Sequence, residues 1–190
     1  MKAAVCRAFG APLVIEDVQL ADPGPGEVRV TMAAVAICHS DITYIEGGWG
    51  GDLPVIFGHE GSGVVNAVGA GVESVKVGDS VVVTLIRACG HCHGCVMGVP
   101  VTCDTTFPLD ARSPITGAGG ESIAHGLRTG AFADEAVVHE SQVVAIPSDL
   151  SMDVASLLAC GVITGLGAVT NTAQVRPGSH VVVILSLIHI

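Results

Sequence analysis

Four cysteines lie close together in a stretch that shows no strand or helix period, and this cluster limits the possible folds more than any other feature. They are Cys89, Cys92, Cys95 and Cys103, with the spacing C-x2-C-x2-C-x7-C. The surrounding segment 88–130 is a long irregular stretch of Cys, His, Gly and Pro, and such a loop needs an external constraint to be ordered. Four thiolates suit tetrahedral zinc, which supplies that constraint. We therefore predict a structural zinc lobe at 88–104.

Two other interpretations of the four cysteines remain open. An iron–sulfur cluster prefers C-x2-C-x2-C-x3-C-P, whereas here the fourth cysteine is farther away and is followed by Asp104. Cysteines without any ligand can also pack as small apolar side chains. The regular spacing favours zinc, and we expect His91 and His93, which lie between the cysteines, to be solvated bystanders.

The composition excludes several classes of protein. Of 190 residues 49% are hydrophobic and 14% charged, which is too apolar for a disordered tail. Eight Lys and Arg against eighteen Asp and Glu give a net charge of −10 without a basic run, so nucleic acid is not expected as a partner. Seven cysteines, an odd number, follow a start that has no signal-peptide pattern. We expect a cytoplasmic protein with reduced, metal-binding thiols.

One long uncharged stretch, 154–175, has the length of a membrane span. It contains several glycines, Asn171 and Gln174, and no basic cluster flanks it. We predict instead one or two buried helices with closely packed small residues, and no membrane partner.

The remaining pattern predicts many short strands. Alternating apolar residues and Gly or Pro turns predict strands at 2–8, 13–20, 27–37, 61–68, 79–87, 131–139 and 142–146. Segment 38–45 is helical or irregular, Ser151 can begin a helix, and 180–184 is one apolar strand. We predict a mainly β, barrel-like domain at 1–150 that leads into an α/β domain at 151–184. Residues 185–190 resemble translated sequencing-adapter DNA and are predicted to be a non-native tail; a naturally short protein that ends on an apolar strand is the alternative.

A second group of metal-binding residue types is spread along the chain. Cys38 begins Cys-His-Ser-Asp, His59 and Glu60 lie in Gly-His-Glu-Gly, and Cys160 is followed by Gly161. Two cysteines and one histidine with an open fourth position form a known catalytic zinc arrangement.

Together these motifs resemble the zinc-containing medium-chain alcohol dehydrogenases. The resemblance covers about residues 1–184 and includes the segments 58–65 and 77–82 and the four-cysteine lobe, in that family's order. It implies a GroES-like, partly open β-barrel catalytic domain with a structural zinc lobe. It further implies that the first helix and strand of an incomplete Rossmann domain follow.

The resemblance also implies a role for each matching residue. Cys38, His59 and Cys160 would hold a catalytic zinc that acts as a Lewis acid, and Glu60 would approach that metal transiently. Asp41 would orient His59, and Ser40 would pass the alcohol proton outward. His39 would contact the phosphates of NAD(P), and Thr164 would lie near the nicotinamide ring. The family further implies two zinc ions per chain, a small alcohol or aldehyde as substrate, and a homo-oligomer in the full-length form.

Some positions depart from the family pattern. Thr43 replaces a histidine that ends the proton relay in some relatives, and no G-x-G-x-x-G turn follows 181–184. Trp49 and Leu85 fall where the walls of the substrate pocket are expected.

The leading hypothesis for the function is hydride transfer between a primary or aromatic alcohol and NAD(P), by an enzyme of which this chain is a fragment. The alternatives are a non-enzymatic zinc-binding fragment and a thiol-dependent formaldehyde dehydrogenase.

Three further residues carry no predicted chemistry. Cys6 has no partner at metal-binding spacing and is predicted to be buried. His125 and His139 are predicted to be exposed and without partners.

Overall fold

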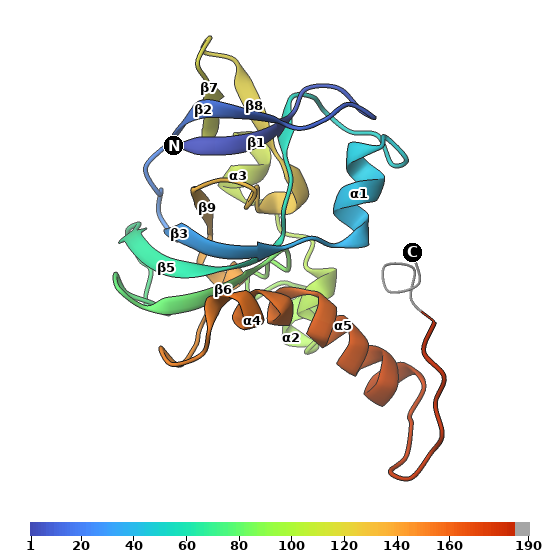
Figure 1. Ribbon diagram of the computed structural model, residues 1–190. Coiled ribbons are helices and arrows are strands. Elements are labelled where there is room, and N and C mark those ends of the chain that lie inside the picture. The colour runs from blue at the N-terminus through green and yellow to red at the C-terminus, as the bar shows by residue number, and fades with distance from the viewer. Residues whose placement is uncertain (185–190) are drawn as a thin grey trace.

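The computed structural model describes residues 1–184, and strands dominate it (Figure 1). The strands are β1 (Lys2–Cys6), β2 (Val14–Leu20), β3 (Glu27–Ala36), β4 (Val55–Ile56), β5 (Glu60–Val68), β6 (Ser80–Thr84), β7 (Ile115–Gly117), β8 (Ser122–His125), β9 (Glu135–His139) and β10 (Val143–Ala145). The helices are α1 (His39–Ile45), α2 (His93–Val96), α3 (Pro108–Ala111), α4 (Met152–Ser156) and α5 (Gly161–Gly167). Single 3-10 turns lie at Pro100–Thr102, Gly126–Arg128, Glu140–Gln142 and Leu157–Ala159, and a π-helical turn at Ala168–Thr172 continues α5.

Five strands close into a small barrel in the order β1-β2-β7-β8-β4. β1 and β2 pair as a hairpin, with Val5 opposite Val14, around a turn in which Gly10 has a φ of +71°. The parallel pair β4–β8 completes the ring. Alternate side chains point inward, and they form one of the buried clusters, which includes Val5, Ile56 and Ile123.

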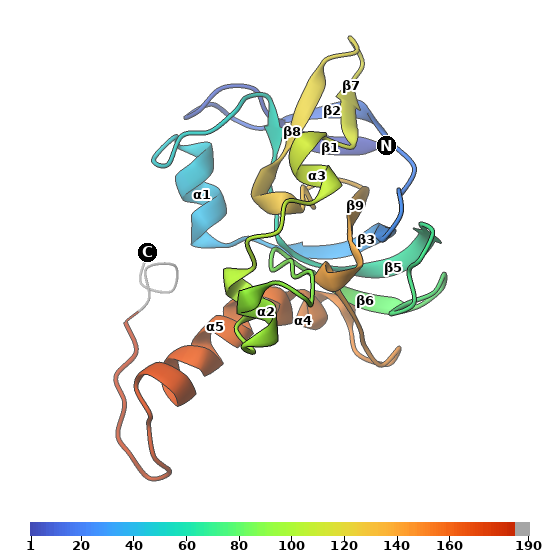
Figure 2. The same ribbon diagram turned by 180° about the vertical axis from the view of Figure 1, so that it is seen from behind.

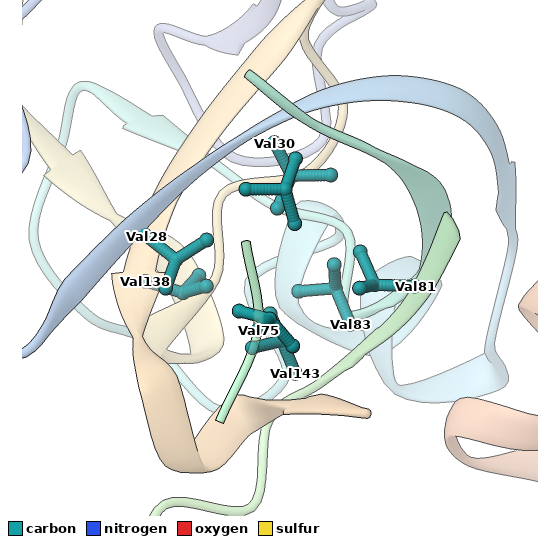
Figure 3. Close-up of a cluster of buried hydrophobic side chains, with 8 residues drawn as sticks. Val28, Val30, Val75, Val81, Val83, Val138 and Val143 are labelled. Carbon is teal, nitrogen blue, oxygen red and sulfur yellow. The ribbon is translucent and has the colours of Figure 1, made fainter. Parts of the chain in front are cut away.

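The other five strands form a sheet in the order β10-β6-β5-β3-β9, and its core is made largely of valine. Figure 3 shows these side chains pointing toward one another from several strands and from the loop that carries Val75. The members of this core are Val28, Val30, Val65, Val75, Val81, Val83, Val138 and Val143. Branching at Cβ stiffens valine and favours strands, so one residue type both forms these strands and fills the space between them.

The two helices after the sheet differ in burial. Ala155 and Ala159 are buried against Val82 of β6, so α4 and the turn after it lie on the sheet. α5 turns away from α4 and projects from the body of the protein in both views (Figures 1 and 2). Leu166 and Val169 on this helical segment are exposed.

The mainly β fold with a barrel is confirmed, but the predicted irregular stretch 88–130 is wrong in part. It contains β7 and β8, which the barrel needs for closure. Their partners β2 and β4 lie far away in sequence, so no local pattern marks these short strands.

Two predictions for the end of the chain are also wrong. α5 is exposed rather than buried, because within residues 1–184 it contacts mainly the flanking turns of its own helix pair. Residues 180–184 are exposed and form no strand, since no described strand lies beside them to pair with. The predicted tail 185–190 lies outside the described residues.

No single helix within residues 1–184 is long and apolar enough to cross a membrane. Met152–Ala159 and Gly161–Thr172 pass that test of length and composition only as a pair, bent by 48°.

Candidate metal centres

Three distant segments bring a group of metal-binding side chains together. Cys38 precedes α1, His59 immediately precedes β5 and Glu60 begins it, and Cys160 lies at the break between α4 with its 3-10 turn and α5. One ligand atom from each of these four residues lies within 4.8 Å of the others. We refer to this group (Cys38, His59, Glu60 and Cys160) as the core cluster. His59 and Glu60 are buried, and the two cysteines are half-buried.

The carboxylate of Asp41 joins two of these segments. It is completely buried. Its Oδ2 accepts a hydrogen bond from the backbone N–H of Cys38 at 3.0 Å, and its Oδ1 accepts one from the N–H of Gly58 at 3.2 Å. The same Oδ1 lies 3.2 Å from Nδ1 of His59. A proton on Nδ1 completes that bond, and Nε2 is then left with its lone pair, as a metal ligand requires.

The electrostatics of His59 follow from this arrangement. Burial alone would lower the pKa of His59, but the hydrogen bond and the charge of Asp41, together with the neighbouring Cys38, outweigh burial and raise it. Asp41 therefore makes the imidazole more basic as well as fixing its orientation.

The backbone before His59 is held by a close packing contact. Gly58 has a φ of +91°, and a Cβ at this position would lie 2.7 Å from the backbone nitrogen of Phe132. The amides of Ala131 and Phe132 donate hydrogen bonds to the carbonyls of Gly58 and Phe57 at 3.0 and 2.9 Å. Only glycine fits this approach, and the approach sets the point at which His59 enters the core cluster.

Cys160 enters from the opposite side, where the helix breaks. Its backbone is not helical (φ −144°, ψ −61°), and the next amide, that of Gly161, donates to Oε2 of Glu60 at 3.2 Å. Burial raises the pKa of the Cys160 thiol to about 11, and the nearby charges of Glu60 and Cys38 add to this effect. Groups that become negative are thus gathered in a partly buried space, which favours a bound cation.

The second group consists of the four thiols of Cys89, Cys92, Cys95 and Cys103, whose sulfur atoms also lie within 4.8 Å of one another. We call it the lobe cluster. Backbone N–H groups point at its sulfurs: Cys89 Sγ accepts from the amide of Cys92 at 3.2 Å, and Cys103 Sγ accepts from that of Cys89 at 3.4 Å. Thr105 and the amides of His91 and Cys92 lower the pKa of Cys89 to about 5, whereas burial and the other thiols raise the pKa of Cys95 to about 11. Cys89 and Cys95 therefore do not ionise equally.

The donor sets of both clusters fit zinc. Four sulfurs suit a structural tetrahedral site, and two sulfurs with one imidazole suit a site with an open position. Calcium and magnesium prefer oxygen ligands, so the sulfurs disfavour them. His91 and His93 are exposed and lie outside the lobe cluster.

The other predicted site residues lie around the core cluster in different environments. α1 carries Ser40, which is half-buried, and His39, which is exposed. Thr164 is exposed on α5, with its hydroxyl oxygen 3.9 Å from Cys160 Sγ. The Thr43 hydroxyl donates to the carbonyl of His39 at 3.1 Å and so bonds within its own helix.

The two candidate pocket walls differ in exposure. Leu85 is half-buried, while the Trp49 side chain is 62% exposed and its ring meets that of Tyr44 edge-on, with centroids 4.9 Å apart.

The sequence-based prediction for two histidines is wrong, and the one for Cys6 is confirmed. His125 is half-buried, and its Nε2 donates to the carbonyl of Thr129 at 2.7 Å. His139 lies 2.9 Å from Ser141 Oγ through Nδ1, and its ring packs edge-on against Phe107. The hydrogen-bond partners lie in short turns close to each histidine in sequence, whereas Phe107 comes from a distant segment. Cys6 is buried, and burial raises the pKa of its thiol.

The fold and the two clusters together define a class: a β-barrel domain that presents one all-cysteine cluster and one mixed cysteine–histidine cluster. The family model "Alcohol dehydrogenase GroES-like domain" matches residues 24–148. The chain belongs to this family, and its similarity to known proteins identifies the zinc-containing alcohol dehydrogenase type.

Individual relatives agree with this assignment. Alcohol dehydrogenase-like 7 of Arabidopsis thaliana is 39% identical over 196 residues, which cover 96% of this chain and 49% of that protein. The crystal structure of an alcohol dehydrogenase zinc-binding domain protein from Burkholderia ambifaria superposes with a TM-score of 0.86 at 36% identity, covering 94% of this chain and 50% of that one. Benzyl alcohol dehydrogenase from Acinetobacter calcoaceticus gives a TM-score of 0.80 at 30% identity, covering 94% and 49%. The chain thus spans about half the length of the relatives it matches.

Proposed function

We propose that this chain is the zinc-carrying catalytic part of an alcohol dehydrogenase that transfers hydride between a primary or aromatic alcohol and NAD(P). The observation that supports this most strongly is the convergence of Cys38, His59 and Cys160, with the buried Asp41 bonded to His59. The similarity to benzyl alcohol dehydrogenase supports an aromatic alcohol as one substrate.

Each residue of the core cluster would contribute a separate property. Zinc bound by Cys38, His59 and Cys160 supplies a Lewis acid at the open position of this site. Asp41 keeps the imidazole of His59 in one orientation and one tautomer. Glu60 holds the amide of Gly161, which fixes the chain directly after Cys160.

Proton transfer would begin at Ser40, the half-buried residue two positions after Cys38. Its hydroxyl can accept the alcohol proton while donating its own outward. Thr43 already bonds to a backbone carbonyl of α1, so we propose that water or the cofactor takes the proton next. His39 and Thr164 are exposed, and we propose that they contact the phosphates and the nicotinamide of the cofactor.

The remaining parts of the proposal concern partners and setting. We propose two zinc ions per chain, one in each cluster, and a small alcohol or aldehyde as the molecule acted on. The net charge of −10 supports the absence of a nucleic-acid partner. A homo-oligomer in the cytoplasm, without a membrane partner, completes the proposal.

The test combines metal analysis with a redox assay. Purified chain should contain two zinc ions, and the longer polypeptide that carries this sequence should reduce NAD or NADP when benzyl alcohol is added. The His59→Ala variant should keep one zinc and lose the activity. If the longer wild-type polypeptide bound two zinc ions but did not reduce NAD or NADP when alcohol was added, the result would instead support a non-enzymatic zinc-binding protein.

A further inference from the structure

The break in the helix at Cys160 leaves backbone groups that a continuous helix would have satisfied. At a helix end, the last carbonyls and the first amides lack partners within the helix. Here the amide on the far side of Cys160, that of Gly161, is taken by Glu60. The carbonyl on the near side, that of Ala159, is taken by a residue of β6: Thr84 donates from Oγ1 at 2.9 Å.

The hydroxyl of Thr84 has its direction fixed by a second contact. The amide of Ile86 donates to Thr84 Oγ1 at 3.4 Å. Because a hydroxyl that accepts there still has one proton to give, that proton is directed to Ala159. Ala159 is itself buried, so its carbonyl has little access to water as a substitute partner.

A buried amide holds the backbone of Thr84 in turn. Gln142 is completely buried, and its Nε2 donates to the carbonyl of Thr84 at 2.9 Å and to that of Arg128 at 3.0 Å. The chain of contacts therefore runs from Gln142 through Thr84 to Ala159 and ends one residue before a sulfur of the core cluster.

We propose that Thr84 is a positioning residue for Cys160: its hydroxyl holds the broken helix at the angle that directs the Cys160 sulfur at the metal. The inference rests on the proposed function in one respect, that the core cluster binds zinc. Removing the hydroxyl frees the carbonyl next to Cys160, so the thiol loses its fixed position while the fold of the sheet remains. Groups that hold metal ligands in place typically change metal affinity by about 10–100-fold when mutated.

The test compares Thr84→Val with Thr84→Ser. Valine keeps the shape of threonine and suits a strand, whereas serine keeps the hydroxyl. Zn²⁺-dependent protection of Cys160 against alkylation, followed by peptide mass spectrometry, measures the core cluster, and Cys95 serves as the internal reference for the lobe cluster. We expect T84V to need about 10-fold more free Zn²⁺ for half-protection of Cys160, with Cys95 unchanged and T84S close to the wild type.

Thr170 provides a matched control, because it lies on the helical segment that follows Cys160. The Thr170 hydroxyl donates to the carbonyl of Leu166 at 2.7 Å, far along the helix from the metal ligands, so T170V should leave the protection of Cys160 unchanged. The absorption spectrum with Co²⁺ should change in T84V and stay as in the wild type in T170V. Equal protection of Cys160 in T84V and the wild type, or an equal loss in T84S and T84V, would overturn the proposal.

A metal-free measurement separates this inference from the proposed function. The amide of Thr164 donates to the carbonyl of Cys160 at 2.9 Å, and its hydrogen exchange reports on the start of α5 without any ion. Faster exchange in metal-free T84V than in metal-free T84S supports the role of the hydroxyl, and equal exchange contradicts it. Wild-type Cys38 and Cys160 that stay unprotected at every Zn²⁺ concentration would refute the proposed metal site alone.

Discussion

The two clusters use similar ligands but are assembled in opposite ways. The lobe cluster draws all four sulfurs from one loop, and none of the buried hydrophobic clusters among residues 1–184 includes a residue of 88–104. The core cluster draws its side chains from residues 38, 59, 60 and 160, which lie just before α1, around the start of β5 and at the break before α5. We therefore expect that a bound metal would order the lobe, whereas the fold already places the side chains of the core cluster.

The strongest test of this difference is to remove one cysteine of the lobe cluster. In Cys92→Ala we expect the loss of one zinc and of hydrogen-exchange protection throughout 88–104. Zinc contributes about 10 kcal/mol or more to the order of small zinc-binding peptides, and Val96, Met97 and Val101 around the cluster are exposed. Zinc analysis and hydrogen exchange by mass spectrometry measure both effects.

The rest of the molecule is the control for that variant. Peptides that cover β3 and β5 should keep their wild-type protection, because their valine core does not involve the lobe. An equal loss of protection in the sheet would show that the lobe is part of the global folding unit, and the comparison would then be wrong.

The next largest effect is expected inside the core cluster. Asp41→Ala leaves the half-buried amide of Cys38 and the buried amide of Gly58 without an acceptor, at about 1–3 kcal/mol for each unsatisfied buried group. Zinc affinity at the core cluster should fall by about 10–100-fold as well. Chemical denaturation of the metal-free chain measures the first effect and zinc competition the second.

A surface aspartate gives the matched control. Asp134 is exposed and accepts one bond, from the amide of Lys2 at 2.7 Å. Asp134→Ala should change the free energy of unfolding by less than about 0.5 kcal/mol. If the two variants had the same stability, the core cluster would not be held by Asp41.

The same contrast explains what the sequence alone can predict. The spacing of the lobe cysteines is local, so the pattern predicts their convergence from physical chemistry. Cys38, His59 and Cys160 have no such spacing, and only a family resemblance connects them. Neither local spacing nor the family resemblance predicts the contacts Glu60–Gly161 and Thr84–Ala159, since each depends on how a broken helix lies on the sheet.

The closure of the barrel is another feature that the sequence alone predicts only in part. The turn at Gly10 predicts the β1–β2 hairpin, but β4 with its two residues pairs with β1 and with the distant β8. Such short strands carry too few alternating positions to be recognised, and their pairing is decided by tertiary packing. The exposure of α5 is likewise a property of its neighbours, not of its own apolar sequence.

A smaller effect is expected from pH. It tests whether protonation of His125, outside the core cluster, lowers the stability of the fold around that cluster. His125 bonds to the carbonyl of Thr129, close to Ala131, whose amide bonds to the carbonyl of Gly58 before His59. Burial lowers the pKa of His125 to about 4 from an ordinary 6.5. The unfolded chain therefore binds this proton at higher pH than the folded chain does.

It follows that the stability contributed by His125 is complete above pH 6.5 and is lost as the pH falls toward 4. We expect a decrease of at most about 3 kcal/mol across this window relative to His125→Gln. Chemical denaturation of both metal-free chains between pH 7 and 4 measures the difference. A difference that stays constant with pH would exclude His125 as the titrating group.

The smallest expected effect comes from replacing His91 beside the lobe cluster, and the same substitution at His59 in the core cluster is its counterpart. His91 is exposed and its Nδ1 lies 2.9 Å from the carbonyl oxygen of Cys89, so it offers the lobe a histidine that is close to the sulfurs but outside the ligand set. His91→Gln should leave two zinc ions bound and change stability by less than about 0.5 kcal/mol. His59→Gln should remove one zinc, because the imidazole there is held by Asp41 for a ligand role. If His91→Gln also released a zinc ion, the lobe would be a mixed cysteine–histidine site, and the chemical contrast between the two clusters would disappear even though their different assembly remained.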